Sequence, residues 1–298
     1  MTCPNSVIIP ANKFPTLNRR INWGIEMLEI PDIWEVSKGE GINIAVLDSG
    51  IAFNHPDFIN AITDMKDFTG SKAGVYDISG HGTHVAGIIC SKNPKVGVAP
   101  ESSLLVGKII NDEGVGDVDV TVEAIYWAVK NKVDIINLSI ESKNNYPQLK
   151  EAVEFAKNMG CIVVCSAGNA GPKKNSVQYP AVYQSTIAVG ALDKNCKLRF
   201  DASTGSHLDI VAPGIDIYST AVPYGYVTRG GSSMAAPFVS GVIALALSRH
   251  RQVPTNQSTI NTPDGMRNYL RSTALKLGNT HDEELYGSGL IHPKCMIV

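Results

Sequence analysis

A serine, an aspartate and a histidine stand where apolar segments of this chain begin or end, and together they could carry out nucleophilic catalysis. Ser233 follows two glycines and precedes a long apolar run, so we expect it at the N-terminus of a buried helix. The free N–H groups and the positive dipole end of such a helix favour negative charge beside the serine hydroxyl. Taken alone, the segment is equally compatible with an ordinary helix cap.

The aspartate and the histidine lie in two other short motifs. Asp48 ends the apolar run 44–47, and open parallel α/β sheets place their active sites at this carboxyl edge. His81 lies between two glycines at the start of another apolar segment that is typical of a helix. In a nucleophilic triad, Ser233 would attack a carbonyl carbon and His81 would take and return the proton. Asp48 would hold the imidazole tautomer and stabilise the imidazolium.

A fourth residue, Asn169, completes this set. It follows a glycine in a short polar segment after an apolar run. Its side-chain N–H groups, together with the backbone N–H of Ser233, could bind the oxyanion that forms during attack on a carbonyl. The four residues therefore predict acyl-transfer chemistry.

Two other chemistries fit the sequence less well. His81 and His84 would need acidic or cysteine partners to bind zinc, and none lies nearby, so we interpret His84 as a structural residue of the helix. An α/β-hydrolase esterase would need glycine where Ala235 stands, and the order serine, acid, histidine. Here the order is aspartate, histidine, serine.

The elements that must position these residues alternate between strand and helix patterns. Apolar runs without strict alternation indicate strands that are buried on both faces, as in a parallel sheet. We expect strands at 43–48, 103–110, 133–140, 161–168, 186–192 and 208–211, and helices at 118–131, 147–159, from Ser233 onwards and at 264–275. Gly160 would end the second helix. The pattern predicts a single doubly wound α/β domain, with a mostly parallel sheet and helices on both faces.

The composition of this chain disfavours some classes of binding partner. Its 298 residues are 44% hydrophobic and 18% charged, with a net charge of −2, so we expect no nucleic-acid partner. No apolar run approaches the roughly 20 residues that a bilayer needs, and the first thirty residues hold no signal-peptide core, so we expect no membrane partner. We interpret the six cysteines as reduced thiols of a cytoplasmic protein: Cys3, Cys90, Cys161, Cys165, Cys196 and Cys295.

The chain order Asp48, His81, Ser233 and the three local motifs resemble those of the subtilisin family of serine endopeptidases. The block Gly-Ser-Ser-Met-Ala-Ala-Pro at 231–237 is the most specific of them, and the resemblance runs from about Ile21 to the end of the chain. It implies a catalytic triad and an oxyanion hole that contains Asn169. Two alternatives stay open on the same fold: a peptide ligase or macrocyclase, and a peptide-binding pseudoprotease without activity.

The resemblance also implies how a substrate is held. An extended protein or peptide would lie between two chain segments and pair with their main-chain groups like an added strand. The residues implied are Gly114, Val115, Gly116, Ser139, Ile140, Glu141, Ala167, Gly168 and Gln178. Glu141 stands where the family has glycine, and Gln178 replaces the glycine at the floor of the pocket for the residue before the scissile bond (P1). We expect a shortened pocket that disfavours large aromatic residues and prefers small, polar or basic ones.

The residues that bind calcium in the family are a second point at which this chain departs from the family pattern. Members with a tight calcium site use an asparagine-rich loop, an N-terminal glutamine and an aspartate after the first motif. This chain keeps Asp57, but its loop 91–96 is short and carries two lysines, and no glutamine lies near Arg19. A hard cation needs several oxygen ligands. We therefore expect no tight metal site and no required cofactor, with a weak carbonyl site near Ala181 and Tyr183 as the alternative.

Residues 1–20 are polar and contain prolines, unlike the rest of the chain. Their sequence Val7-Ile8-Ile9-Pro10 resembles the motif with which the short N-terminal extension of intracellular subtilisins lies across the active site. Proline lacks an N–H group and fixes φ, which gives a physical reason for resistance to cleavage. We therefore expect an inhibitory segment over residues 1 to about 18 and a catalytic domain over 21–298. The alternative is a frayed terminus.

Overall fold

The computed structural model describes residues 21–171, 173–253, 258–278 and 282–297, so the expected N-terminal extension lies outside the described residues. Seven parallel strands form one sheet in the order β2-β3-β1-β4-β5-β6-β7. Their bounds are β1 (Asn43–Asp48), β2 (Ile62–Asp67), β3 (Ser103–Lys108), β4 (Ile135–Leu138), β5 (Ile162–Ser166), β6 (Thr186–Leu192) and β7 (Ile210–Pro213). The predicted parallel α/β fold is confirmed.

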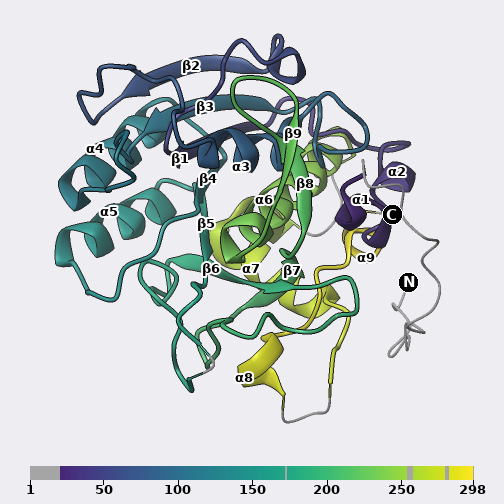
Figure 1. Ribbon diagram of the computed structural model, residues 1–298. Helices are drawn as coiled ribbons and strands as arrows, with labels where there is room; N and C mark the ends of the chain where they lie inside the picture. Colours follow the sequence, from purple (N-terminus) through teal and green to yellow (C-terminus); the bar gives the residue numbers. More distant parts are fainter. Residues whose placement is uncertain (1–20, 172, 254–257, 279–281, 298) are drawn as a thin grey trace.

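Helices cover both faces of this sheet. They are α1 (Trp23–Met27), α2 (Ile30–Ile33), α3 (His81–Cys90), α4 (Val118–Lys130), α5 (Pro147–Asn158), α6 (Ser232–Gln252), α7 (Pro263–Thr273), α8 (Glu283–Tyr286) and α9 (Pro293–Ile297), with 3-10 turns at Pro56–Phe58 and Ser258–Asn261. Figure 1 shows α4 and α5 on one side of the sheet and α3 and α6 on the other. This two-sided covering is what a doubly wound sheet requires.

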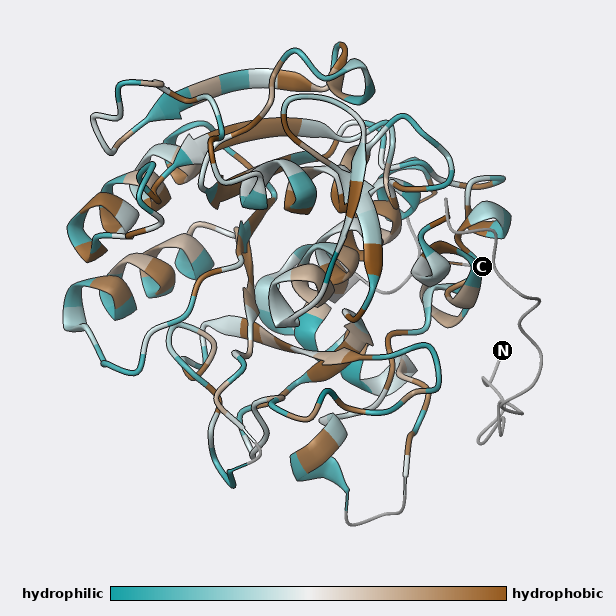
Figure 2. Ribbon diagram, in the orientation of Figure 1, coloured by the Kyte–Doolittle hydropathy of each residue, from teal (hydrophilic) through white to brown (hydrophobic). Residues whose placement is uncertain are grey.

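Local sequence signals explain where the two outer helices begin and end. The Asp117 side chain caps α4 by accepting hydrogen bonds from the N–H groups of the first turn. Pro147 opens α5, where its missing N–H costs nothing. Gly160 follows α5 with φ +89°, as predicted for the glycine that ends this helix. In Figure 2 both helices alternate between hydrophobic and hydrophilic residues, because only one side of each faces the sheet.

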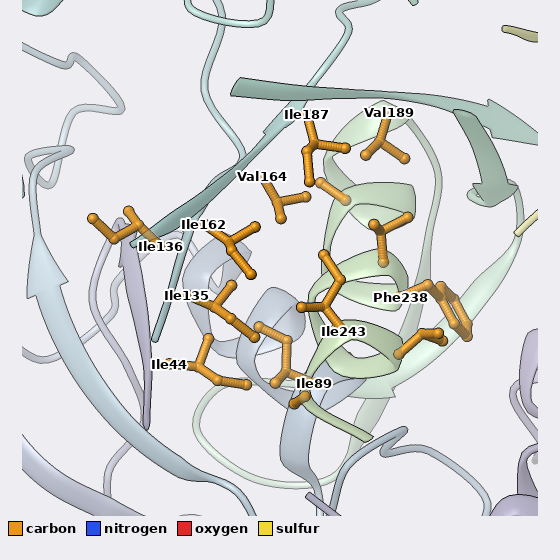
Figure 3. Packing of buried hydrophobic residues seen from close by; sticks show 14 of the residues in the cluster. Ile44, Ile89, Ile135, Ile136, Ile162, Val164, Ile187, Val189, Phe238 and Ile243 are labelled. Carbon is orange, nitrogen blue, oxygen red and sulfur yellow. The ribbon is translucent and has the colours of Figure 1, made fainter. Parts of the chain in front are cut away.

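The core lies between the sheet and its helices. Every residue of β4 and of β5 is buried, as expected for strands covered on both faces. Figure 3 shows Ile135 and Ile162 directed towards Ile243 of α6, whereas Ile136 is directed to the opposite face. Helix α6 is long and apolar enough to cross a membrane, but 89% of its apolar window is buried inside this fold. Its composition is therefore explained by the core.

Three strands were absent from the sequence-based prediction. Strand β2 is a largely exposed edge strand that pairs with β3. Strands β8 (Ile217–Thr220) and β9 (Tyr226–Arg229) form an antiparallel hairpin that packs beside α3. The prediction that every cysteine is a reduced thiol is wrong at Cys295, which is disulfide-bonded. Cys3 lies outside the described residues, and the other four cysteines are free.

Candidate active site

Strand β1 and helix α3 bring Asp48 and His81 together. Asp48 is the last residue of β1 and His81 the first of α3, and His81 Nδ1 lies 2.7 Å from Asp48 Oδ1. The carboxylate can only accept, so Nδ1 carries the proton and Nε2 is left as the basic nitrogen. The Asp48 side chain is fully buried, whereas that of His81 is 27% exposed. The carboxylate is therefore enclosed by protein, and the imidazole is accessible from solvent.

The surroundings of His81 favour its protonated form. Burial of the ring opposes the charge, and the nearby Arg229 guanidinium opposes it as well. The negative charge of Asp48 and its hydrogen bond to the ring outweigh both effects and raise the pKa of His81 above the ordinary value of 6.5. A histidine tuned in this direction holds a proton more strongly, as a general base should.

Ser233 and His81 line the same cleft, whose volume is about 590 Å³. Ser233 is the second residue of α6, and its Oγ donates to the Ser139 carbonyl oxygen at 3.4 Å. Within the described part of the chain, no hydrogen bond joins Ser233 to His81. Bonds between a nucleophile and its base are often long in a free enzyme and shorten when substrate binds.

A proline in α6 helps to fix the first turn of this helix. Pro237 has no N–H group, so it leaves the Ser233 carbonyl, four residues earlier, without its helical partner. The Ser139 hydroxyl donates to that carbonyl instead, at 3.0 Å. Asn137 in turn donates to the Ser139 hydroxyl at 3.0 Å and accepts from Ser240 at 2.9 Å. This buried chain of side chains ties Ser233 to strand β4.

Sequence reasoning did not identify Asn137. The available signal was an amide residue inside the apolar run 135–138, because a buried amide must find partners. The structure shows that those partners belong to the helix that carries Ser233.

Asn169 lies against the start of α6. Its Oδ1 accepts from the Ser232 N–H at 3.3 Å, so the amide nitrogen is the end left for another acceptor. The Gly168 N–H donates to the Ser232 hydroxyl at 3.1 Å and holds the same segment in place. Gly231 precedes the helix with φ +149°, in the region that favours glycine. The arrangement leaves donors of Asn169 near the N–H groups of the first turn.

Some of the predicted substrate-binding residues line the cleft and others do not. Those that line it are Gly114, Gly116, Ser139, Ile140 and Glu141. Val115 is 62% exposed, and Ala167 is fully buried. Val115, Ala167, Gly168 and Gln178 are not among the described lining residues of the cleft. The two segments named from the sequence thus form its walls.

Gln178 and Glu141 converge on one backbone position. A Cβ built on Gly168 would lie 2.6 Å from Gln178 Oε1 and 2.9 Å from Glu141 Oε2. Gly168 also has φ +102°, so only glycine fits there. Glu141 Oε2 accepts from the Asn169 N–H at 3.0 Å, and Gln178 is only 8% exposed. Both long side chains therefore occupy space next to the segment that carries Asn169.

Asp77 was not singled out from the sequence, yet it joins the segments that carry Asp48 and His81. Its carboxylate is fully buried. Oδ1 accepts from the Ser49 hydroxyl at 2.9 Å and from the Gly80 N–H at 2.8 Å. Oδ2 accepts from the Thr83 N–H at 2.8 Å and from the Thr83 hydroxyl at 2.7 Å. One carboxylate thereby fixes the end of β1 relative to the start of α3.

The Asp57 carboxylate, beside the expected calcium loop, has hydrogen-bond partners within the protein. Asp57 already accepts hydrogen bonds from the Ser91 hydroxyl and, at 3.1 Å, from the Tyr226 hydroxyl. It is the single carboxylate in this contact set, whereas calcium takes six to eight oxygens. At the weaker candidate site, the Thr186 hydroxyl lies 2.8 Å from the Tyr183 carbonyl oxygen and 3.4 Å from that of Ala181. Hydroxyl groups thus occupy acceptors that a cation would use.

His84 has a structural environment. It is fully buried, and its Nε2 lies 3.0 Å from the Ile217 carbonyl oxygen and 3.2 Å from that of Val227. Burial lowers the pKa of His84 to about 3, so the ring is neutral and donates from Nε2 to the β8–β9 hairpin. Among the residues that the structure describes, no group of three histidine, cysteine or acidic side chains could hold a metal ion.

A parallel sheet that brings a histidine and a serine at a helix N-terminus to one cleft, with a buried aspartate behind the histidine, is the architecture of a serine hydrolase. Residues 39–289 match the subtilase family of peptidases, Peptidase S8. The chain belongs to this family and is a subtilisin-like, serine-type endopeptidase.

Three relatives illustrate the similarity. An intracellular serine protease of Paenibacillus polymyxa is 37% identical over 279 residues, which cover 90% of this chain and 84% of that protein. The major intracellular serine protease of Bacillus subtilis is 40% identical over 256 residues, covering 82% of this chain and 78% of that protein. Subtilisin DY of Bacillus licheniformis is 38% identical over 260 residues, covering 86% and 90%.

Proposed function

We propose that Asp48, His81 and Ser233 are the catalytic triad of this endopeptidase and that Asn169 contributes to its oxyanion hole. The 2.7 Å contact between His81 Nδ1 and Asp48 Oδ1 is the observation that carries the assignment. It leaves His81 Nε2 basic in the cleft that Ser233 also lines. A proline-bearing helix and the contact with Ser139 hold the serine there.

The reaction follows from these positions. Ser233 Oγ bonds to the carbonyl carbon of the scissile peptide while His81 Nε2 takes the proton of the Ser233 hydroxyl. The carbonyl oxygen becomes an oxyanion. Asn169 side-chain N–H groups and the Ser233 backbone N–H stabilise that negative charge. His81 then gives its proton to the leaving amine as the C–N bond breaks. Water attacks the acyl-enzyme in the same way and releases the acid and free Ser233.

Glu141 and Gln178 favour small, polar or basic residues at P1. The Glu141 carboxylate and the Gln178 amide oxygen both approach Gly168, and Glu141 also lines the cleft. A bulky aromatic side chain would have to displace these polar groups, whereas a lysine or arginine would meet a carboxylate. Turnover of a peptide with phenylalanine at P1 at least equal to that of matched alanine, glutamine and arginine peptides would contradict this preference.

Residues 1 to about 18 act as an inhibitory segment, and the protease works in the cytoplasm. The sequence Val7-Ile8-Ile9-Pro10 supports the first statement, and the names of two relatives as intracellular proteases support the second. The active domain would then comprise residues 21–298. An intact-mass time course tests latency beside a Ser233→Ala control. Loss of an N-terminal fragment from the active protein alone, with a parallel rise in casein hydrolysis, is the expected result.

Two measurements separate this function from a ligase and from an inactive peptide-binding protein. A fluorophosphonate should label Ser233, because labelling requires an activated serine. Product masses from a defined peptide should show the addition of water rather than joined peptides. Absence of labelling in the full chain and in the chain without residues 1–20 would favour the pseudoprotease. Joined products would favour the ligase.

A further inference from the structure

The β8–β9 hairpin lies next to the turn that carries His81 and outside the described lining of the cleft. The cleft is lined by residues of the 114–116 and 139–141 segments, and none of its described lining residues comes from β8 or β9. Figure 1 shows the hairpin beside α3, the helix whose first residue is His81, and the chain runs from the end of β9 directly into α6, which carries Ser233. A substrate whose acyl part lies between the 114–116 and 139–141 segments can extend its leaving-group part past His81 towards the hairpin.

Arg229 is the charged residue at the end of this hairpin. It is the last residue of β9 and stands four positions before Ser233. One guanidinium nitrogen, Nη2, donates to the Ser79 carbonyl oxygen at 2.8 Å. The same nitrogen lies 3.1 Å from the position that a Cβ on Gly80 would take, and Gly80 directly precedes His81. The half-buried guanidinium therefore sits against the turn that delivers the histidine.

The positive charge of Arg229 is not neutralised by a carboxylate contact. Of the ion pairs among the described residues, none includes Arg229. Asp48 and Asp77, which also act on His81, are committed elsewhere, because Asp48 binds His81 and Asp77 binds Ser49, Gly80 and Thr83. The Ser79 carbonyl is a neutral acceptor that uses one N–H of the guanidinium. A second acceptor can still bind.

Arg199 lies on the other side of the same backbone segment but differs in its charge balance. It donates to the Gly230 carbonyl oxygen at 2.8 Å and lies 3.6 Å from a Cβ position on Gly231. Its Nε is 2.6 Å from an Asp201 carboxylate oxygen. The Arg199 charge is thereby compensated, and this residue mainly holds its loop against the segment that leads into α6.

We propose that Arg229 selects substrates that carry a carboxylate on the leaving-group side, within the first two residues after the scissile bond (P1′ and P2′). This inference rests on the proposed triad. With Glu141 on the acyl side, it predicts cleavage sites in which a basic or polar P1 residue is followed by an acidic one. Complementary charge of this kind discriminates between substrates more than it strengthens binding in general.

The test uses the protease without its N-terminal segment. The segment is removed by the protease's own processing or by truncation at residue 20. All peptides share the same acyl-side sequence and end in an amide, and they carry Glu, Gln or Lys at P1′ or at P2′. One further peptide has uncharged residues at P1′ and P2′ and ends after P2′ in a free carboxylate. We expect kcat/KM for Glu to exceed that for Gln by about two- to fivefold at low salt, as for an exposed charge pair. Lys should be disfavoured, and 0.5 M salt should reduce the difference.

Variants locate the effect. Arg229→Gln should bring the Glu to Gln ratio close to one, whereas Arg229→Lys should keep most of it. Lys95→Gln, which removes an exposed cation beyond the far end of α3, should leave the ratio unchanged. A higher kcat/KM with an internal Glu shows that Arg229 selects a side-chain carboxylate. A higher kcat/KM for the free-acid peptide alone shows that it selects the carboxylate at a chain end.

Two results would overturn the proposal: wild-type rates at low salt that gain neither from an internal Glu nor from a free terminal carboxylate, or a preference that survives Arg229→Gln. Failure of the underlying function looks different. In that case no peptide is cleaved and a fluorophosphonate does not label Ser233, whatever residue follows the scissile bond.

Discussion

Asp77→Asn tests whether one buried carboxylate holds the aspartate and the histidine of the site in register. The amide keeps the shape of the side chain but has one accepting oxygen instead of two. The Gly80 and Thr83 N–H groups lie on opposite oxygens of Asp77, and neither can reverse its role. Whichever way the amide is turned, one of these buried N–H groups faces an NH₂ group and loses its acceptor.

The expected cost follows from that loss. Hydrogen bonds to charged groups contribute about 1.5–3 kcal/mol, and an unsatisfied buried donor costs about 1–3 kcal/mol. The hydroxyl of Thr83 cannot compensate fully, because it already accepts from the Ala52 N–H at 2.9 Å. We therefore expect Asp77→Asn to lower the free energy of unfolding by about 2–4 kcal/mol. Movement of the first turn of α3 should also reduce kcat/KM at least tenfold, since small displacements of a general base are costly.

Urea unfolding of the Ser233→Ala form, which avoids self-digestion, measures the stability change, and peptide hydrolysis in the Ser233 form measures activity. Asp64→Asn is the matched control. That carboxylate is exposed on β2 and, among the described residues, accepts only from the N–H of its neighbour Met65, so its loss should stay within about 0.5 kcal/mol. If Asp77→Asn is as mild as this control in both assays, Asp77 does not position the pair.

Three further predictions address the pocket, the base and the metal. Gln178→Gly should raise kcat/KM for phenylalanine relative to alanine at P1 by about tenfold or more, because the pocket gains the volume of a buried side chain, and an unchanged ratio would contradict the pocket assignment. Because the charges of Asp48 and Asp77 outweigh burial and the Arg229 charge, kcat/KM should fall as pH decreases through a midpoint above 6.5, and a lower midpoint would contradict this balance. A chelator should shift the melting temperature of the Ser233→Ala form by only a few degrees, since hydroxyl groups already satisfy Asp57, whereas a fall of tens of degrees would show a tight metal site.

The sequence predicts the sheet and the four polar residues of the site because their signals are local. Asp48 ends an uninterrupted apolar strand, and His81 and Ser233 open apolar helices next to glycines. Each pattern is contained in about ten residues. The parallel arrangement of strands then brings the carboxyl ends of the strands to one edge, which the βαβ spacing already implies.

The elements absent from the prediction depend on contacts between distant segments. Strand β2 has an exposed, polar pattern, so no apolar run marks it, and its pairing with β3 supplies the missing stabilisation. The β8–β9 hairpin is short, and it is fixed by the His84 imidazole, which donates to both strands from a different element. Asp77 lies in a turn where periodicity carries no information. Such residues become visible only when their partners are placed in space.

Departures from the family pattern carry information of a different kind. Glycine at the positions of Glu141 and Gln178 would leave open space, whereas these side chains introduce a carboxylate and an amide beside Gly168. Arg229 places a cation against the turn before His81. The proposed triad accounts for how a peptide bond is broken, and the proposed roles of Glu141 and Arg229 set opposite charges on its two sides. Selectivity for one kind of bond should therefore disappear stepwise as these charges are removed, while hydrolysis itself continues.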